Sequence, residues 1–503
     1  MPNCKWMLLP LLLLLNACAS RTKIAAPDLP INSVSALHER LDTILQDSAL
    51  AQSTVGVKVI ALKTDEVLYE KNSRLLFHPA SNMKLFTTAA ALKNLGPNYK
   101  FPTILYADTT AVADSVVHGN LYLKGFANPD LTTEDLRWMA QQLKSQGIKK
   151  ITGDLICDDS YLDDFYWGWG WMWDDVSAWE WAPISALTVE DNCVEVKVKP
   201  GQKVGDSLIV QMEPQTAFMK IVNYGVTVDS TDTTRIDAFK VERIWRPLPE
   251  NTVVIEGGRT QKARPREFTI DVVNAPLYAG TLLAELLLKE GLEFKGQILN
   301  GTAPDTTMLL VKHLSAPLTE IVMNTNKVSD NLSAELLLKT LGAEIYGVPG
   351  TAKKGFYAIN KFMHEIGADT TSYKLADGSG VSRYGTNTAD NILALLKAMY
   401  RDFQVQAEFM ASLSIAGVDG TLKNRMHGTA ADGKVRAKTG NLRGVSALSG
   451  FTSTAYGEPI AFSMLMAHFL GSSSKIKKIQ DRVAVALSEF RWKSSIGASV
   501  LSK

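Results

Sequence analysis

The chain has 503 residues, of which 46% are hydrophobic and 21% are charged. This is the composition of an ordinary globular protein, and the length is sufficient for two or three domains. The 53 lysines and arginines nearly balance the 52 aspartates and glutamates, so the formal net charge is only +1. A chain without an excess of basic residues is not expected to bind polyanions, and we predict no nucleic-acid partner.

The first seventeen residues have the layout of a secretory signal. Lys5 precedes an apolar run over residues 7–15, and small residues follow. The run is too short for a membrane span, which needs about 20 apolar residues. We therefore predict that residues 1–17 are a signal peptide and that the mature chain is exported to the periplasm.

Cys18 follows this signal in the sequence Leu-Asn-Ala-Cys. The sequence resembles the lipobox at which bacterial lipoprotein signals are cut, so we expect Cys18 to carry a lipid that anchors the protein to a bacterial membrane. A plain cleaved signal is the alternative. Residues 18–32 are polar and contain proline, which is typical of a tether, and the lipid is the only membrane contact that we predict.

The folded part is predicted to begin with an amphipathic helix over residues 34–50, because Leu37, Leu41 and Leu45 recur at helical spacing. Two strand-like apolar runs follow over residues 55–62 and 67–69, separated by a polar turn.

A second helix is predicted to begin near Ser81, because Pro79 precedes an alanine-rich run of good helix formers. Ser81 and Lys84 would then share one face of that helix. A serine hydroxyl is a poor nucleophile until a base takes its proton, and a lysine can be that base only where its pKa is lowered. The apolar neighbours Leu85 and Phe86 favour the necessary burial. The pair is therefore a candidate nucleophile and base.

Residues 99–314 contain short strand-like runs between turns, with one helical run over residues 280–292. We interpret this region as a β-rich insertion, possibly of two subdomains. Its cysteines, Cys157 and Cys193, either form a disulfide in an oxidising compartment or remain buried thiols. Six tryptophans between Trp167 and Trp181 either line a binding site or pack a loop.

The last third of the chain contains two further motifs at the ends of predicted elements. Ser329-Asp330-Asn331 stands directly before a helical run over residues 332–341, and Lys438-Thr439-Gly440 ends a strand-like run over residues 435–439. Strands over residues 445–452 and 460–467 and a closing helix over residues 476–490 follow. Both ends of the chain are thus built alike, so residues 33–98 and 315–503 are predicted to form one catalytic domain with a shared sheet and covering helices.

Each motif has an ordinary explanation when it stands alone. S-x-x-K also occurs at Ser472 in a polar loop, helix capping explains Ser-Asp-Asn, and a solvated strand end explains Lys-Thr-Gly. In this order and on these elements, however, the three form the motif set of penicillin-binding proteins and serine β-lactamases.

The chain resembles in particular the D-alanyl-D-alanine carboxypeptidase/endopeptidase family, the class C low-molecular-mass penicillin-binding proteins. The resemblance includes Gly153-Asp154-Leu155 and the runs over residues 377–383 and 438–450, and the long separation of Ser81 from Ser329 coincides with the insertion. It implies an α/β (α+β) fold of the penicillin-binding/β-lactamase-like type, with an antiparallel sheet and flanking helices. It also implies a serine hydrolase that trims or cleaves peptidoglycan stem peptides and is inhibited by β-lactam antibiotics.

The resemblance implies roles for the catalytic residues. Ser81 would attack the carbonyl of the penultimate D-Ala, with Lys84 as base. Ser329 would relay a proton to the leaving amine, and Asn331 would orient Lys84 and the substrate amide. Lys438 belongs to the same group of catalytic residues.

The resemblance also implies how the substrate is bound. Lys438, Thr439 and Gly440 would form the strand motif that receives the terminal carboxylate. The backbone N–H groups of Ser81 and Asn441 would form the oxyanion hole. Asn441 stands where the family usually has Thr or Ser, so its side chain is a departure from the pattern.

Two more substrate contacts are implied by the resemblance. Asp175 in the tryptophan-rich segment would contact the amino end of a diaminopimelate side chain, and Arg383 would be its companion. Packing of the loop is the alternative for Asp175.

Two other functions remain open. A β-lactamase would share the first step, but the E-x-x-L-N loop of the compact class is missing between Asn331 and Lys438. A non-catalytic cell-wall-binding lipoprotein of the same fold would not need Ser81 and Lys84, which are intact. No cofactor or metal is expected, because Ala368 stands where a zinc-protease helix beginning at His364 needs its second histidine. Carboxypeptidase and endopeptidase activities share the chemistry, and the sequence does not separate them.

Overall fold

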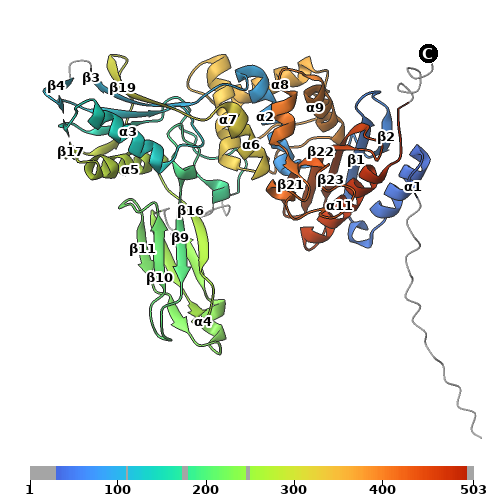
Figure 1. Cartoon of the computed structure of the whole chain (residues 1–503), viewed down its shortest axis with the longest axis horizontal. Coiled ribbons are helices and arrows are strands. Elements are labelled where there is room, and N and C mark those ends of the chain that lie inside the picture. Colours follow the sequence, from blue (N-terminus) through green and yellow to red (C-terminus); the bar gives the residue numbers. More distant parts are fainter. Residues whose placement is uncertain (1–29, 109–111, 173–178, 245–249, 495–503) are drawn as a thin grey trace, which may run out of the picture.

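The computed structural model describes residues 30–108, 112–172, 179–244 and 250–494 (Figure 1). The two ends of the chain meet in one six-stranded antiparallel sheet, in which β1 pairs along its whole length with β23. In spatial order the strands are β2 (Val67–Lys71), β1 (Thr54–Ala61), β23 (Pro459–Ala467), β22 (Val445–Ser453), β21 (Arg436–Leu442) and β20 (Ser414–Ile415).

Helices cover both faces of this sheet, because alternate residues of its strands are apolar on each side. Val57 and Val59 pack with the terminal helices α1 (Val34–Leu45) and α11 (Ser473–Glu489). Ile60, Ala461 and Leu465 pack on the opposite side. The helices there are α2 (Met83–Leu95), α6 (Leu318–Lys327), α7 (Asn331–Tyr346), α8 (Ala352–Glu365), α9 (Ala389–Arg401) and α10 (Gln406–Ser412).

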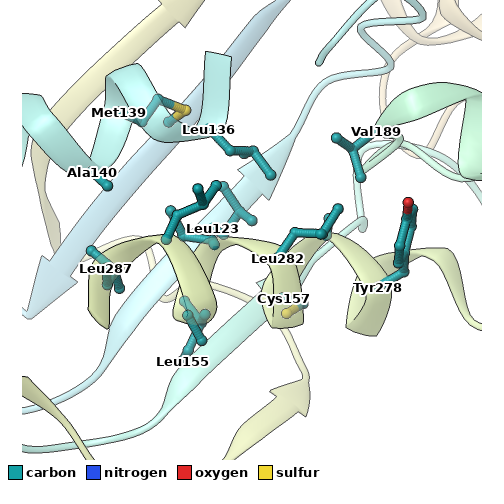
Figure 2. Close-up of a cluster of buried hydrophobic side chains, with 14 of the residues drawn as sticks. Leu123, Leu136, Met139, Ala140, Leu155, Cys157, Val189, Tyr278, Leu282 and Leu287 are labelled. Atoms are coloured by element: carbon teal, nitrogen blue, oxygen red, sulfur yellow. The ribbon is translucent and has the colours of Figure 1, made fainter. Parts of the chain in front are cut away.

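The middle of the chain builds a second body beside these helices (Figure 1). One sheet of five strands contains β18 (Ile298–Asn300), β8 (Leu155–Asp158), β6 (Leu121–Gly125), β3 (Pro102–Asp108) and β19 (Thr307–Leu314). A smaller sheet contains β17 (Glu293–Phe294), β7 (Lys150–Ile151), β5 (Val116–Val117) and β4 (Val112–Ala113). Helices α3 (Thr133–Ser145) and α5 (Ala275–Lys289) pack on this part. Figure 2 shows its buried cluster, in which the sheet provides Leu123 and Leu155, and the helices provide Leu136, Met139, Leu282 and Leu287.

A mostly β segment projects from the second body (Figure 1). Its three small sheets contain β10 (Ile209–Glu213), β9 (Cys193–Lys199) and β16 (Arg266–Asp271); β11 (Lys220–Asn223), β14 (Thr252–Glu256) and β13 (Lys240–Arg243); and β12 (Val226–Val228) with β15 (Gly258–Thr260). The short helix α4 (Thr233–Asp237) lies at its far end.

The fold class predicted from the sequence is confirmed, with corrections to single elements. The first helix ends at Leu45, and a separate 3-10 turn follows over Ser48–Leu50. Asp47 is the N-cap of this turn, because its side chain accepts a hydrogen bond from the backbone N–H of Ala49. The expectation of one helix in the insertion was wrong, since α3 is a second long helix there. Cys157 and Cys193 are both buried free thiols. None of the helices in the described ranges combines the length and apolarity that crossing a membrane requires.

Candidate active site

Ser81 lies in a single 3-10 turn, Ala80–Asn82, directly before α2. The strand β21 lies against this turn, and the side chain of Asn82 donates a hydrogen bond of 3.0 Å to the carbonyl of Lys438. The approach is so close that a Cβ on Gly440 would lie 2.9 Å from the carbonyl oxygen of Pro79. Glycine in the Lys-Thr-Gly motif therefore lets the strand reach the serine turn.

Lys84 is fully buried, and its Nζ has three hydrogen-bond acceptors. Nζ donates to Ser81 Oγ at 3.2 Å, to Asn331 Oδ1 at 2.7 Å and to the carbonyl of Ser379 at 2.9 Å. Burial lowers the pKa of Lys84 to about 8, although nearby carboxylates, Asp330 first, oppose the effect. A lysine in this state can accept a proton from the serine at its side.

A second buried lysine comes from β21, the strand that lies against the serine turn. Lys438 Nζ donates to Ser329 Oγ at 2.8 Å and to the carbonyl of Thr439 at 3.0 Å. Burial, with the positive charge of Lys84, holds the pKa of Lys438 well below its usual range. Ser329 has a φ of 69°, a left-handed conformation that is costly for a serine and that places it just before the N-cap of α7.

These groups open into one cleft of about 1050 Å³. Of the residues predicted from the sequence, the cleft is lined by Ser81, Ser329, Asn331, Arg383, Thr439, Gly440 and Asn441. Lys84 and Lys438 lie beneath its surface and reach the hydroxyls of Ser81 and Ser329. The three motifs, far apart in the chain, thus meet at one wall.

Several basic side chains also line the cleft. Besides Arg383, it is lined by Arg425, Arg443 and Lys477, whereas Glu180 is the acidic side chain among its described lining residues. Arg425 is paired with Asp481 at 2.7 Å, and Arg383 donates to the carbonyl of Arg443 at 3.0 Å. A cleft of this charge suits a ligand with carboxylates.

Some tryptophans of the 167–181 segment line a binding site and others pack a loop, so both explanations given above apply. Trp179 and Trp181 line the cleft. Trp171 is buried instead, and its Nε1 donates to Asp377 at 3.0 Å. Asp175 lies outside the described residues, so its predicted contact stays a prediction.

Several residues of the site were not predicted from the sequence. The hydroxyl of Thr421 accepts a bond of 2.9 Å from Thr439 Oγ1, and the carbonyl of Ser379 holds Lys84. Ser379 lies in a loop that Asp377 caps, since its carboxylate accepts bonds from the backbone N–H groups of Gly380 and Ser382. The Asp-Gly-Ser-Gly sequence was a signal for this loop, but the pattern alone did not reveal what the loop contacts.

Comparisons with known proteins agree on one family. A model of the D-Ala-D-Ala carboxypeptidase 3 (S13) family matches residues 37–490. A D-alanyl-D-alanine carboxypeptidase of Actinomadura sp. strain R39 is 36% identical over 470 residues, which cover 90% of this chain and 85% of the relative. The D-alanyl-D-alanine carboxypeptidase DacB of Haemophilus influenzae is 29% identical over 412 residues, 82% of this chain and 84% of the relative. The crystal structure of penicillin binding protein 4 from Haemophilus influenzae superposes with a TM-score of 0.79 at 26% identity, covering 90% of this chain and 99% of that one. The same protein has been solved in complex with a β-lactam.

Proposed function

The chain belongs to the D-Ala-D-Ala carboxypeptidase 3 (S13) family and is a serine peptidase, and from this premise we propose that Ser81 is the residue acylated by the substrate. The observation that carries the proposal is the fully buried Lys84, whose Nζ lies 3.2 Å from Ser81 Oγ. A buried amine with a pKa of about 8 is a competent base near neutral pH.

In the proposed acylation, neutral Lys84 takes the proton of Ser81 while Oγ bonds to the carbonyl carbon of the penultimate D-Ala. Negative charge develops on the carbonyl oxygen, and the backbone N–H groups of Ser81 and Asn441 stabilise it. The bond from carbon to nitrogen then breaks. Ser329, bonded to Lys438, delivers its proton to the nitrogen of the leaving D-Ala, and the proton that Lys84 took from Ser81 replaces it. Water hydrolyses the ester and restores Ser81.

The substrate is proposed to be the peptidoglycan stem peptide. Thr439 with Lys438 would hold the terminal carboxylate, and Asn331 would orient the substrate amide. The excess of cations in the cleft supports a peptide that carries several carboxylates, with Arg383 as one contact and Asp175 as a contact to an amino group. Cleavage of a cross-linked peptide would use the same acylation chemistry, so endopeptidase activity is part of the proposal.

Acylation by benzylpenicillin tests the role of Ser81. Intact-mass spectrometry is expected to show one added acyl group on the wild-type chain and none on Ser81→Ala. The matched control is Ser472→Ala. Ser472 belongs to another S-x-x-K match and is the N-cap of α11, so this variant should keep the adduct. Slow release of the acyl group supports a peptidase, and rapid turnover a β-lactamase. A folded wild-type sample with neither adduct nor hydrolysis would contradict the proposal and favour a non-catalytic binding protein.

We also propose that the protein is exported and anchored through lipid on Cys18, with residues 33–98 and 315–503 as the catalytic domain and residues 99–314 as the insertion. Both the signal and Cys18 lie outside the described residues. Cells grown with labelled palmitate are expected to label the protein, and Cys18→Ala is expected to abolish the label. Equal labelling of both forms would contradict lipidation at Cys18.

A further inference from the structure

Helix α7 contacts the catalytic lysine by two routes. Asn331, its first residue, accepts the bond from Lys84 Nζ directly. Glu335 is four residues later, so it lies on the same face of the helix one turn on. It is only 2% exposed, although a carboxylate is rarely buried without a partner. The acylation chemistry proposed above gives it no role.

The carboxylate of Glu335 holds the loop that holds Lys84. Its Oε1 accepts from the backbone N–H of Ser379 at 2.8 Å and of Gly378 at 2.9 Å, and its Oε2 lies 3.0 Å from the N–H of Gly378. The carbonyl of the same Ser379 accepts from Lys84 Nζ at 2.9 Å. The carboxylate of Glu335 and the amine of Lys84 are therefore hydrogen-bonded to the two backbone polar groups of the same residue, Ser379.

The charges around this pair come from the loop, from α7 and from β21. Asp377 lies in the loop itself, Asp330 caps α7, and Lys438 approaches from β21. Lys339, one turn beyond Glu335, is bonded to Asp163 at 2.6 Å and to the carbonyl of Phe165. Burial, and then Asp377, raise the pKa of Glu335 to about 7.

Glu335 also has a route to solvent. It borders a cavity of about 220 Å³ that the catalytic cleft does not share, lined by Lys339, Trp167, Trp169 and Ala376 among others. Trp169 at the cavity is 62% exposed. A carboxylate that borders such a cavity can exchange its proton with solvent although its own surface is almost fully covered.

We propose that Glu335 is a positioning residue that fixes the place of Lys84 through the Gly378-Ser379 backbone and, by its negative charge, favours the protonated form of Lys84. The inference rests on the proposed function, because it assumes that Lys84 is the base for Ser81. Its consequence is that the charge on Glu335 sets the pH above which acylation begins.

The test is the rate of acylation by benzylpenicillin between pH 5 and 10 in the wild type and in Glu335→Gln. The amide oxygen of glutamine can keep both bonds of Oε1, while the negative charge is lost. Removing an anion near a lysine lowers the pKa of that lysine, so the midpoint of the acid limb is expected to move to lower pH by about one unit. The maximal rate is expected to fall less than about tenfold, because the loop remains bonded.

Two further variants separate charge from packing. Glu335→Asp keeps the charge but shortens the reach, so it is expected to keep the wild-type midpoint and lower the maximal rate. Glu344→Gln removes a carboxylate from the same helix that bonds to Tyr99 and Tyr161 instead, and it is expected to leave the midpoint unchanged.

The possible outcomes distinguish the inference from the proposed function. Acylation of Glu335→Gln with an unmoved midpoint overturns the role of Glu335 and leaves Ser81 as the nucleophile. If the glutamine variant does not fold, the aspartate variant decides, and a midpoint moved by a unit or more in it overturns the inference. No acylation of the wild type at any pH overturns the proposed function itself.

Discussion

Two lysines without contact to water are the central fact at the scale of single residues. At pH 7 a lysine with its ordinary pKa of 10.5 is neutral in about one molecule in three thousand, whereas Lys84, with a pKa of about 8, is neutral in about one in ten. Burial is the main cause of the lowered pKa of Lys84, and burial with the charge of Lys84 also holds the pKa of Lys438 well below its usual range. Burial thereby makes Lys84 a better proton acceptor at neutral pH than the lysine of a solvent-exposed S-x-x-K pair.

A single glycine controls how closely the Ser379 loop approaches the serine turn. Gly380 has a φ of 84°, and a Cβ there would lie 1.9 Å from the carbonyl oxygen of Ala80. Gly380→Ala is therefore expected to displace the loop or the turn, to lower stability by about 2–4 kcal/mol and to slow acylation at least tenfold. Urea unfolding and the rate of penicillin acylation measure the two effects.

The matched control is Gly147→Ala. Gly147 has almost the same φ, 85°, but a Cβ there meets nothing within 4 Å. It should lose only about 1 kcal/mol of stability and keep the acylation rate. If both variants lost the same stability and neither changed the rate, close approach at Gly380 would be disproved.

At the scale of elements, the predictable parts of the fold were those whose sequence pattern is local. α2 and α7 each begin at a motif, and the proline and the capping residue mark them. The expectation that Lys-Thr-Gly ends its strand was wrong, because β21 continues to pair with β22 as far as Leu442. α3 was missed although Thr132 and Asp135 form a capping box before it. Its apolar residues are spaced for a helix, but the short strand-like runs around it dominated the interpretation.

Some residues of the site were not predicted because they are defined by contacts between distant parts of the chain, which no local sequence pattern reveals. Glu335 stands in an otherwise apolar stretch of α7, and only the return of the chain 43 residues later, at Gly378, shows what it binds. Thr421 and Thr439 meet in the same way. The motif residues were found because their order is characteristic, whereas the residues that support them are identified by distance alone.

At the scale of the whole molecule, the second body meets the helices of the first at a group of acidic side chains. Asp130 follows β6, Asp191 precedes β9, and Asp330 caps α7. Burial, and then the charge of Asp330, raise the pKa of Asp130 to about 6 and that of Asp191 to about 8. The contact between the two bodies therefore depends on how many of these carboxyls carry a proton.

This contact predicts that the protein becomes less stable as the pH rises. A carboxyl that has a pKa of about 3.8 when unfolded and about 8 when folded gives its full stabilisation below pH 4 and loses it as the pH rises towards 8. Asp191→Asn keeps the shape and suits the left-handed backbone at this position, where φ is 51°. The variant is expected to be more stable than the wild type at pH 8.5 and to change less at pH 5, as measured by urea unfolding. Asp114→Asn is the control, because Asp114 has the same φ of 51° but lies in the turn between β4 and β5 instead of beside Asp130 and Asp330. A wild-type stability that is constant from pH 5 to 8.5, or an equal gain in both variants, would show that the protonation of Asp191 does not govern the junction.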